Sequence, residues 1–186
     1  KHLKSFYISY LMKNIDNVEF WEIVNQSMNN LSKGKGENDK IISQGDFSED
    51  NVIVKDGKYT LIDFESLGIN NRFGEIAFIF VTYGKKLFNS RQKRIFLDEY
   101  QRDIGKKING LDRKVEEWVP IMVFLVFLWA VKHLFRIRNK EIHSDLTNGL
   151  KIEKEIKYIS KVFKNCIKLK AIDKKYSKFN IKKVLS

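Results

Sequence analysis

An Asp-Gly pair between two runs of β-branched and aromatic residues is the feature that most constrains the fold. Asp56-Gly57 separates the run 52–54 from the run 59–62, and residues of these types favour extended backbone. Asp-Gly between two such runs is the strongest local signal for a tight β-hairpin turn. The sequence therefore predicts a two-stranded antiparallel hairpin in the middle of the chain.

The register of this hairpin places two oxygen-bearing side chains close together. Counting outward from a two-residue turn, Val54 pairs with Tyr59 and Asn51 lies opposite Ile62. Asp63 then lies diagonal to Asn51, although 12 residues separate the two in sequence. Mg²⁺ is commonly held by one or two oxygen-bearing side chains, with waters and substrate phosphates completing its shell. Asn51 and Asp63 are therefore candidate Mg²⁺ ligands.

The rest of the chain shows helical spacing of its apolar residues. Apolar positions recur every three or four residues between 3 and 31, which predicts two helices, and a polar break at 32–39 follows. A short extended piece is expected at 41–42. Further helices are expected over 75–83, 91–104, 114–138 and 150–169, with Pro120 in a first helical turn. The fold class is thus mainly α with a small β-hairpin (α+β).

Asp46 lies in the loop before the hairpin, five residues ahead of Asn51. In kinase-type phosphoryl transfer a loop Asp accepts the proton of the attacking hydroxyl, and an Asn five residues later binds metal. A second Asp after the next strand binds metal as well. Asp46, Asn51 and Asp63 occur in that order. An Asp or Asn beside a turn is also commonly a loop cap, so the spacing alone leaves both interpretations open.

The stretch 43–54, followed by Leu61-Ile62-Asp63-Phe64-Glu65, resembles the aminoglycoside phosphotransferase and choline kinase superfamily. The loop of that superfamily reads H-G-D-x-x-x-x-N, and its next strand ends in I-D-F-E or I-D-W. Residues 70–77 are similar to the N-x-R and D-I-A pattern of choline kinase and related bacterial proteins. The close match covers about 41–77. The resemblance implies the C-terminal lobe of the protein-kinase-like fold over 1–170, with catalytic loop and metal hairpin at 41–65 and a basic tail at 171–186.

The resemblance also implies a chemistry. The protein would move the γ-phosphoryl group of ATP or GTP to the hydroxyl of a small molecule, with Asp46 as the catalytic base. Asn51 and Asp63 would hold Mg²⁺, and Glu65 would contact the substrate. Trp129 is a further substrate-binding candidate, because an aromatic ring can face a cationic substrate, although such residues are commonly core.

Three more residues are expected to support the loop, and the sequence departs from the family pattern at two of them. Gln44 stands where the family has His, Glu75 replaces an Asp, and Arg72 is expected to pair with a carboxylate near the loop. A third departure is larger, because no glycine-rich phosphate loop and no strand Lys with a helix Glu partner are visible. The N-terminal nucleotide lobe is therefore expected to be absent from this chain and to come from a missing segment or another chain.

The positive charge is concentrated near the C-terminus. Residues 151–186 hold twelve Lys and three acids, so they carry +9 of the formal net charge of +12. The alternative function is therefore a non-catalytic kinase-like binding module that docks an anionic partner through this basic tail. Nucleic acid is not expected, because aromatic and basic residues do not interleave as in known RNA-binding modules. Residues 174–186 are expected to be loosely ordered.

Other features favour a cytoplasmic protein. Cys166 is the single cysteine, so no internal disulfide can form, and no signal segment opens the chain. The most apolar run, 118–131, is about 14 residues, shorter than the roughly 20 that cross a bilayer as a helix. We therefore expect a buried core helix there and no membrane span.

Overall fold

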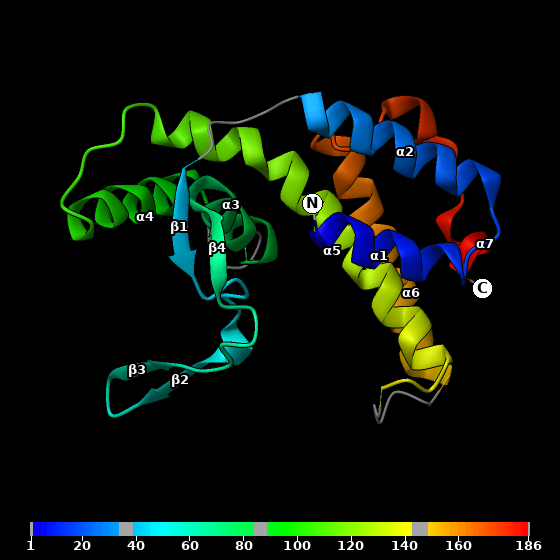
Figure 1. The fold of residues 1–186 in the computed structure, drawn as a ribbon, viewed down its shortest axis with the longest axis horizontal. Coiled ribbons are helices and arrows are strands. Elements are labelled where there is room, and N and C mark those ends of the chain that lie inside the picture. The colour runs from blue at the N-terminus through cyan, green and yellow to red at the C-terminus, as the bar shows by residue number, and fades with distance from the viewer. Residues whose placement is uncertain (1, 34–38, 84–88, 143–148, 186) are drawn as a thin grey trace. The chain divides into compact units, whose positions relative to one another are not determined.

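The computed structural model describes residues 2–33, 39–83, 89–142 and 149–185 (Figure 1). This part of the chain is mostly helical with two small antiparallel sheets, which confirms the predicted α+β class. The helices are α1 (His2–Met12), α2 (Val18–Lys33), α3 (Arg72–Tyr83), α4 (Ser90–Asp103), α5 (Leu111–Arg138), α6 (Gly149–Lys168) and α7 (Ile181–Leu185). The strands are β1 (Lys40–Ser43), β2 (Val52–Lys55), β3 (Lys58–Leu61) and β4 (Gly68–Asn71), and 3-10 helices form at Glu49–Asn51 and Lys174–Lys178.

The chain divides into two compact units, which are described one at a time. The β-containing unit comprises residues 34–122, and the helical unit comprises residues 1–33 together with 123–186. Helix α5 contributes its residues up to Met122 to the β-containing unit and the remainder to the helical unit.

Strands β2 and β3 form the hairpin that the Asp-Gly turn predicts. Val54 pairs with Tyr59 in the expected register. Asp56 and Gly57 both have positive φ, 51° and 72°, as a type I′ turn requires. One residue beyond the ladder, the Ile62 N–H donates to the Asn51 carbonyl oxygen at 2.9 Å. The hairpin and its register are confirmed.

A second two-stranded ribbon, β1 with β4, was not predicted in full. Strand β1 has two adjacent β-branched residues, whereas β4 is Gly-Ile-Asn-Asn with only one, a composition that gives little strand signal. The strands pair from Lys40 with Asn71 to Ser43 with Gly68. The ribbon therefore closes the base of the segment 44–67, which contains the catalytic-loop candidates and the hairpin.

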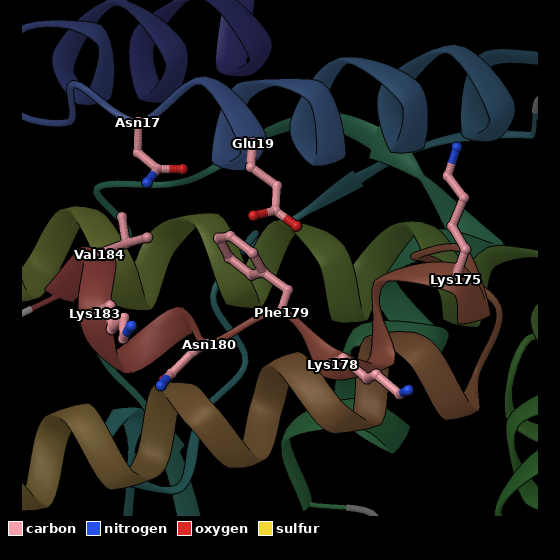
Figure 2. A pocket seen from close by; sticks show the side chains of 8 residues that line it. All are labelled: Asn17, Glu19, Lys175, Lys178, Phe179, Asn180, Lys183 and Val184. Atoms are coloured by element: carbon pink, nitrogen blue, oxygen red, sulfur yellow. The ribbon is translucent and has the colours of Figure 1, made fainter.

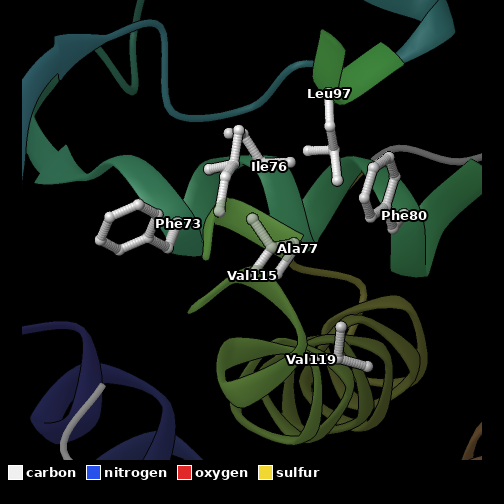
Figure 3. Close-up of a cluster of buried hydrophobic side chains, with 8 residues drawn as sticks. Phe73, Ile76, Ala77, Phe80, Leu97, Val115 and Val119 are labelled. Atoms are coloured by element: carbon white, nitrogen blue, oxygen red, sulfur yellow. The ribbon is translucent and has the colours of Figure 1, made fainter. Parts of the chain in front are cut away.

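The core of the β-containing unit lies between α3, α4 and the first half of α5 (Figure 3). Helix α3 lies close to α5 at Gly74, where an added Cβ would approach Trp118 Cε3 to 3.1 Å. This contact fixes the start of α3, from which Arg72 and Glu75 project. The buried members of the cluster are Phe73, Ile76, Ala77, Phe80, Leu97, Leu111, Val115 and Val119.

The helical unit has an aromatic core of its own. Phe127 of α5 is fully buried, with its ring centroid 5.6 Å from that of Phe163 in α6 and 6.4 Å from that of Phe20 in α2. Helix α6 also buries Ile159 and Cys166. Burial raises the pKa of the Cys166 thiol, so this cysteine stays protonated and unreactive.

The expectation that the chain is loosely ordered from Lys174 onward is wrong as far as Leu185. The segment forms a 3-10 helix and then α7, and both Ile181 and Leu185 are buried. The Tyr176 hydroxyl donates to Gln26 Oε1 of α2 at 2.7 Å. Apolar residues spaced between the lysines supply enough buried surface to order the segment. The prediction failed because it considered only the high lysine content of the segment.

Pro120 does not lie in a first helical turn, which corrects the prediction. Helix α5 begins at Leu111, directly after Gly110 with φ of 63°, so Pro120 is inside it. Proline has no N–H to donate to the carbonyl of residue 116. The helix continues through this missing bond because Val119 and Val123 on either side are buried.

Helix α5 is the one helix in the described ranges that is long and apolar enough to cross a membrane. This finding rests on length and composition alone, and the buried core helices of soluble proteins meet the same two criteria. Of its most apolar window, 56% is buried within the structure. Phe127, Val131 and Leu134 of this helix are buried, as its expected core role requires, whereas its expected lack of a membrane span stays a prediction.

Candidate active site

The candidate site is built from the loop between β1 and β2 and from the chain after β3, all within the β-containing unit. Gly45 has φ of 84°, a conformation that suits glycine. A Cβ there would collide with the backbone carbonyl oxygen of Ser66, so the loop passes directly against the segment that follows the hairpin. Asp46 comes next and is half-buried.

Gln44 connects the two parts of the site. It is buried, and its Oε1 accepts a hydrogen bond from the Asp46 backbone N–H at 2.8 Å. Its Nε2 donates to the backbone carbonyl oxygen of Asp63 at 2.5 Å. A single amide thus satisfies one donor and one acceptor on two chain segments. These contacts are of the kind expected of a residue that supports the loop.

Asn51 is held against Asp46. Its Nδ2 donates to the Asp46 carbonyl oxygen at 2.9 Å and lies 3.4 Å from Asp46 Oδ2. The side chain is buried, with 8% of its surface exposed. Both hydrogen bonds use the amide nitrogen, which leaves Oδ1 available as a ligand.

Asp63 stands at the open end of the hairpin in a left-handed backbone conformation, with φ of 57°. Such a conformation is uncommon outside glycine, although Asp adopts it more readily than most residues. Its Oδ1 accepts the Glu65 N–H at 3.3 Å, and the side chain is exposed. Phe64 and Glu65 are also exposed, so this end of the hairpin presents a carboxylate pair to solvent.

Glu75 reaches the loop from the first turn of α3. Its carboxyl lies near two hydrogen-bond donors, the Ser43 hydroxyl and the Gly45 backbone N–H. Asn70 of β4 in turn donates to Ser43 Oγ at 2.9 Å. Burial raises the pKa of the Glu75 carboxyl most, the nearby donors of Ser43 and Gly45 lower it, and the charge of Asp46 raises it, with a net rise.

Arg72 anchors the start of β1. Its Nε lies 2.8 Å from Asp39 Oδ2, and its backbone N–H donates to the Asp39 carbonyl oxygen at 2.8 Å. The guanidinium also donates to the Tyr100 hydroxyl at 2.7 Å. Sequence reasoning missed Asp39, Tyr100 and Asn70, because only the fold brings these ordinary polar residues next to Arg72 and Ser43.

Trp129 belongs to the helical unit, whereas the other seven candidate residues belong to the β-containing unit. It is 48% exposed, and its ring stacks on His133 with centroids 5.1 Å apart. Because Trp129 and the catalytic-loop candidates lie in different units, its role in substrate binding stays a prediction.

The donor set suits Mg²⁺ bound together with phosphates. The described residues contain no cluster of three His, Cys, Asp or Glu side chains that could hold a metal by themselves. Mg²⁺ rarely needs one, since it keeps several waters and takes one or two protein oxygens plus substrate phosphates. The exposed Asp63 carboxylate and the free Oδ1 of Asn51 match that requirement.

A separate pocket of about 290 Å³ lies in the helical unit (Figure 2). It is formed by Asn17 and Glu19 at the start of α2 together with Lys175, Lys178 and Phe179 of the C-terminal segment. None of the predicted site residues lines it.

Comparisons with models of protein families, with curated proteins and with solved structures gave no match.

Proposed function

We propose that the β-containing unit is the catalytic part of a small-molecule phosphotransferase of the kinase-like type. The observation that carries the proposal is the position of Gln44, which hydrogen-bonds the backbone at both Asp46 and Asp63. Asn51 is hydrogen-bonded to Asp46 from the other side. Three residues with the spacing of a catalytic base and two metal ligands are therefore held by one small network, although 17 residues separate the first from the last.

In the proposed reaction the hydroxyl oxygen of the acceptor forms a bond to the γ-phosphorus of ATP or GTP. The bond between that phosphorus and the β,γ-bridging oxygen breaks, and the nucleoside diphosphate leaves. Asp46 orients the acceptor hydroxyl and receives its proton. Asn51 and Asp63 would hold Mg²⁺, which would supply neutralisation of the phosphate charge. Such sites work mainly by positioning and electrostatics.

A nucleotide-binding lobe supplied by another segment or chain completes this proposal. The hairpin is exposed on both faces, and Ile53, Tyr59 and Phe64 are 50%, 77% and 52% exposed. A two-stranded hairpin is marginally stable by itself, and exposed apolar side chains favour a covering partner. The exposed Glu65 beside Asp63 would attract a cationic acceptor, and a hydroxylated small molecule is the substrate class we propose.

Mg²⁺-dependent nucleotide binding tests the proposal. A fluorescent ATP analogue is titrated against this chain and against a form extended upstream of Lys1, each with and without Mg²⁺. We expect Mg²⁺-dependent binding that is tighter in the extended form and is lost in Asp63→Ala. Asp98→Ala, an exposed aspartate of α4, is the matched control and should bind normally. Absence of binding in both forms, or normal binding by Asp63→Ala, would overturn the assignment.

A further inference from the structure

Helix α6 carries a straight row of lysines that the proposed phosphotransferase does not use. The row consists of Lys154, Lys157, Lys161, Lys164 and Lys168, which are all exposed. Their spacing alternates between three and four residues, so at 3.6 residues per turn they fall within an arc of about 80° on the helix surface. From first to last the row is about 21 Å long at 1.5 Å per residue.

The row lies directly opposite the buried face of α6. Ile159, Phe163 and Cys166 point into the core of the helical unit, and the same helical arithmetic puts the centre of that face about 180° from the centre of the row. Packing therefore fixes the direction in which the lysines project. The row is a permanent feature of the folded surface and does not depend on ordering upon binding.

Charge around the row is poorly compensated. No ion pair found within the described ranges uses any of the five ammonium groups. The acids nearest in sequence are Glu153 and Glu155 at one end of the helix. From Lys157 to Lys168 the helix has no acidic residue at all.

We propose that the lysine row docks the protein on an anionic lipid surface. A convex helix touches a flat surface along a line, and the exposed lysines of α6 are arranged in such a line. Clusters of four to eight lysines on a helix are typical of sites that bind anionic headgroups. Tyr158, 43% exposed, lies beside the row as the neighbour of Lys154 and Lys161, and tyrosine is favoured at membrane interfaces.

The same geometry is less suited to nucleic acid. Non-specific binding of single strands uses a basic groove with several aromatic stacking platforms, whereas this row is convex and has one neighbouring tyrosine. The apolar face of α6 is buried, so the lipid contact we propose is electrostatic and does not require insertion.

Vesicle co-sedimentation of the full chain tests the proposal. The probes are phosphatidylcholine vesicles, alone or with a third of the lipid replaced by phosphatidylserine. We expect binding only to the phosphatidylserine vesicles, weakening as salt is raised. The triple variant Lys157→Gln, Lys161→Gln, Lys164→Gln should bind about a hundredfold more weakly. Gln has nearly the helix propensity of Lys, so the variant should fold, which circular dichroism checks.

A matched variant separates the row from net charge. Lys13→Gln, Lys106→Gln, Lys107→Gln removes the same three charges at exposed positions outside α6 and should bind within a few-fold of the parent chain. The proposal is overturned if the parent chain does not bind phosphatidylserine vesicles, or if the two triple variants lose the same amount of vesicle affinity. Release from the vesicles by stoichiometric duplex DNA or RNA would also overturn it, in favour of nucleic acid.

Discussion

The side chain of Gln44 hydrogen-bonds the backbone carbonyl oxygen of Asp63, 19 residues later in the chain. Its other end accepts the N–H of Asp46 at 2.8 Å. Both partners are backbone groups, so Gln44 sets the separation between the loop and the end of the hairpin independently of any ligand. The phosphotransferase pattern that residues 43–54 resemble has His at this position, and Gln offers the same pairing of one donor and one acceptor.

Replacing Gln44 should therefore loosen the site. Gln44→Leu leaves the Asp46 N–H and the Asp63 carbonyl without their partner, and each unsatisfied group costs about 1–3 kcal/mol. We expect a fall in unfolding free energy of about 2–4 kcal/mol in urea and faster hydrogen exchange at the Asp46 amide. Gln44→His should restore most of the loss. An unchanged exchange rate in Gln44→Leu would show that the amide does not hold the loop.

Two glycines with positive φ should respond differently to alanine. Gly57→Ala at the hairpin turn meets no atom within 4 Å, so only the cost of the left-handed backbone is expected, about 1–2 kcal/mol. Gly45→Ala adds a collision with the Ser66 carbonyl oxygen, for a total of at least about 3 kcal/mol. Urea unfolding of the two variants measures the difference, and equal losses would contradict the close approach at Gly45.

Arg72 should not tolerate lysine. Its guanidinium contacts Asp39 and Tyr100 at once, with its side chain 16% exposed, and a lysine cannot make both contacts in that geometry. We expect Arg72→Lys to cost about 1–3 kcal/mol of unfolding free energy. Arg102→Lys, in an exposed pair with Glu99 on α4, should cost less than about 0.5 kcal/mol. Similar losses in the two variants would deny Arg72 its anchoring role.

The raised pKa of Glu75 predicts a pH dependence of stability. Between the unfolded value of 4.5 and the higher folded pKa, the folded state binds more protons than the unfolded state. Glu75 should therefore favour folding below about pH 4.5 and lose that contribution as pH rises through the folded pKa. Compared with Glu75→Gln, the parent chain should lose stability over this window in urea melts at stepped pH. A parallel pH profile for the two proteins would contradict the assignment.

Local turn chemistry explains which parts of the fold the sequence predicted. The hairpin register follows from Asp56 and Gly57, whose positive φ values leave little freedom in how β2 and β3 pair. The helices follow from apolar spacing. Strand β4 could not be found this way, because its pairing with β1 depends on a contact across 24 intervening residues and not on its own composition.

The candidate site also has a part that local turn chemistry predicts and a part that depends on the assembled fold. The diagonal placement of Asn51 and Asp63 follows from the register, so these two candidate metal ligands could be proposed from sequence. The supporting network could not be drawn in full, because the approach of Glu75 to Ser43 and the hydrogen bond from Asn70 to Ser43 need β1, β4 and α3 to assemble first. The order of the C-terminal segment was missed for a related reason, since burial of Ile181 depends on the helices it packs against.

The most direct measurement is Mn²⁺ paramagnetic broadening in a two-dimensional amide NMR spectrum, recorded with ATP present. Mn²⁺ occupies Mg²⁺ sites and broadens only the signals of nearby amides. It therefore locates the metal site even if the chain has no catalytic activity. The account predicts selective loss of the Asn51 and Asp63 signals in the parent chain and in Asp98→Ala, and their retention in Asp63→Asn. Broadening centred elsewhere, or unchanged by Asp63→Asn, would contradict the proposed phosphotransferase site.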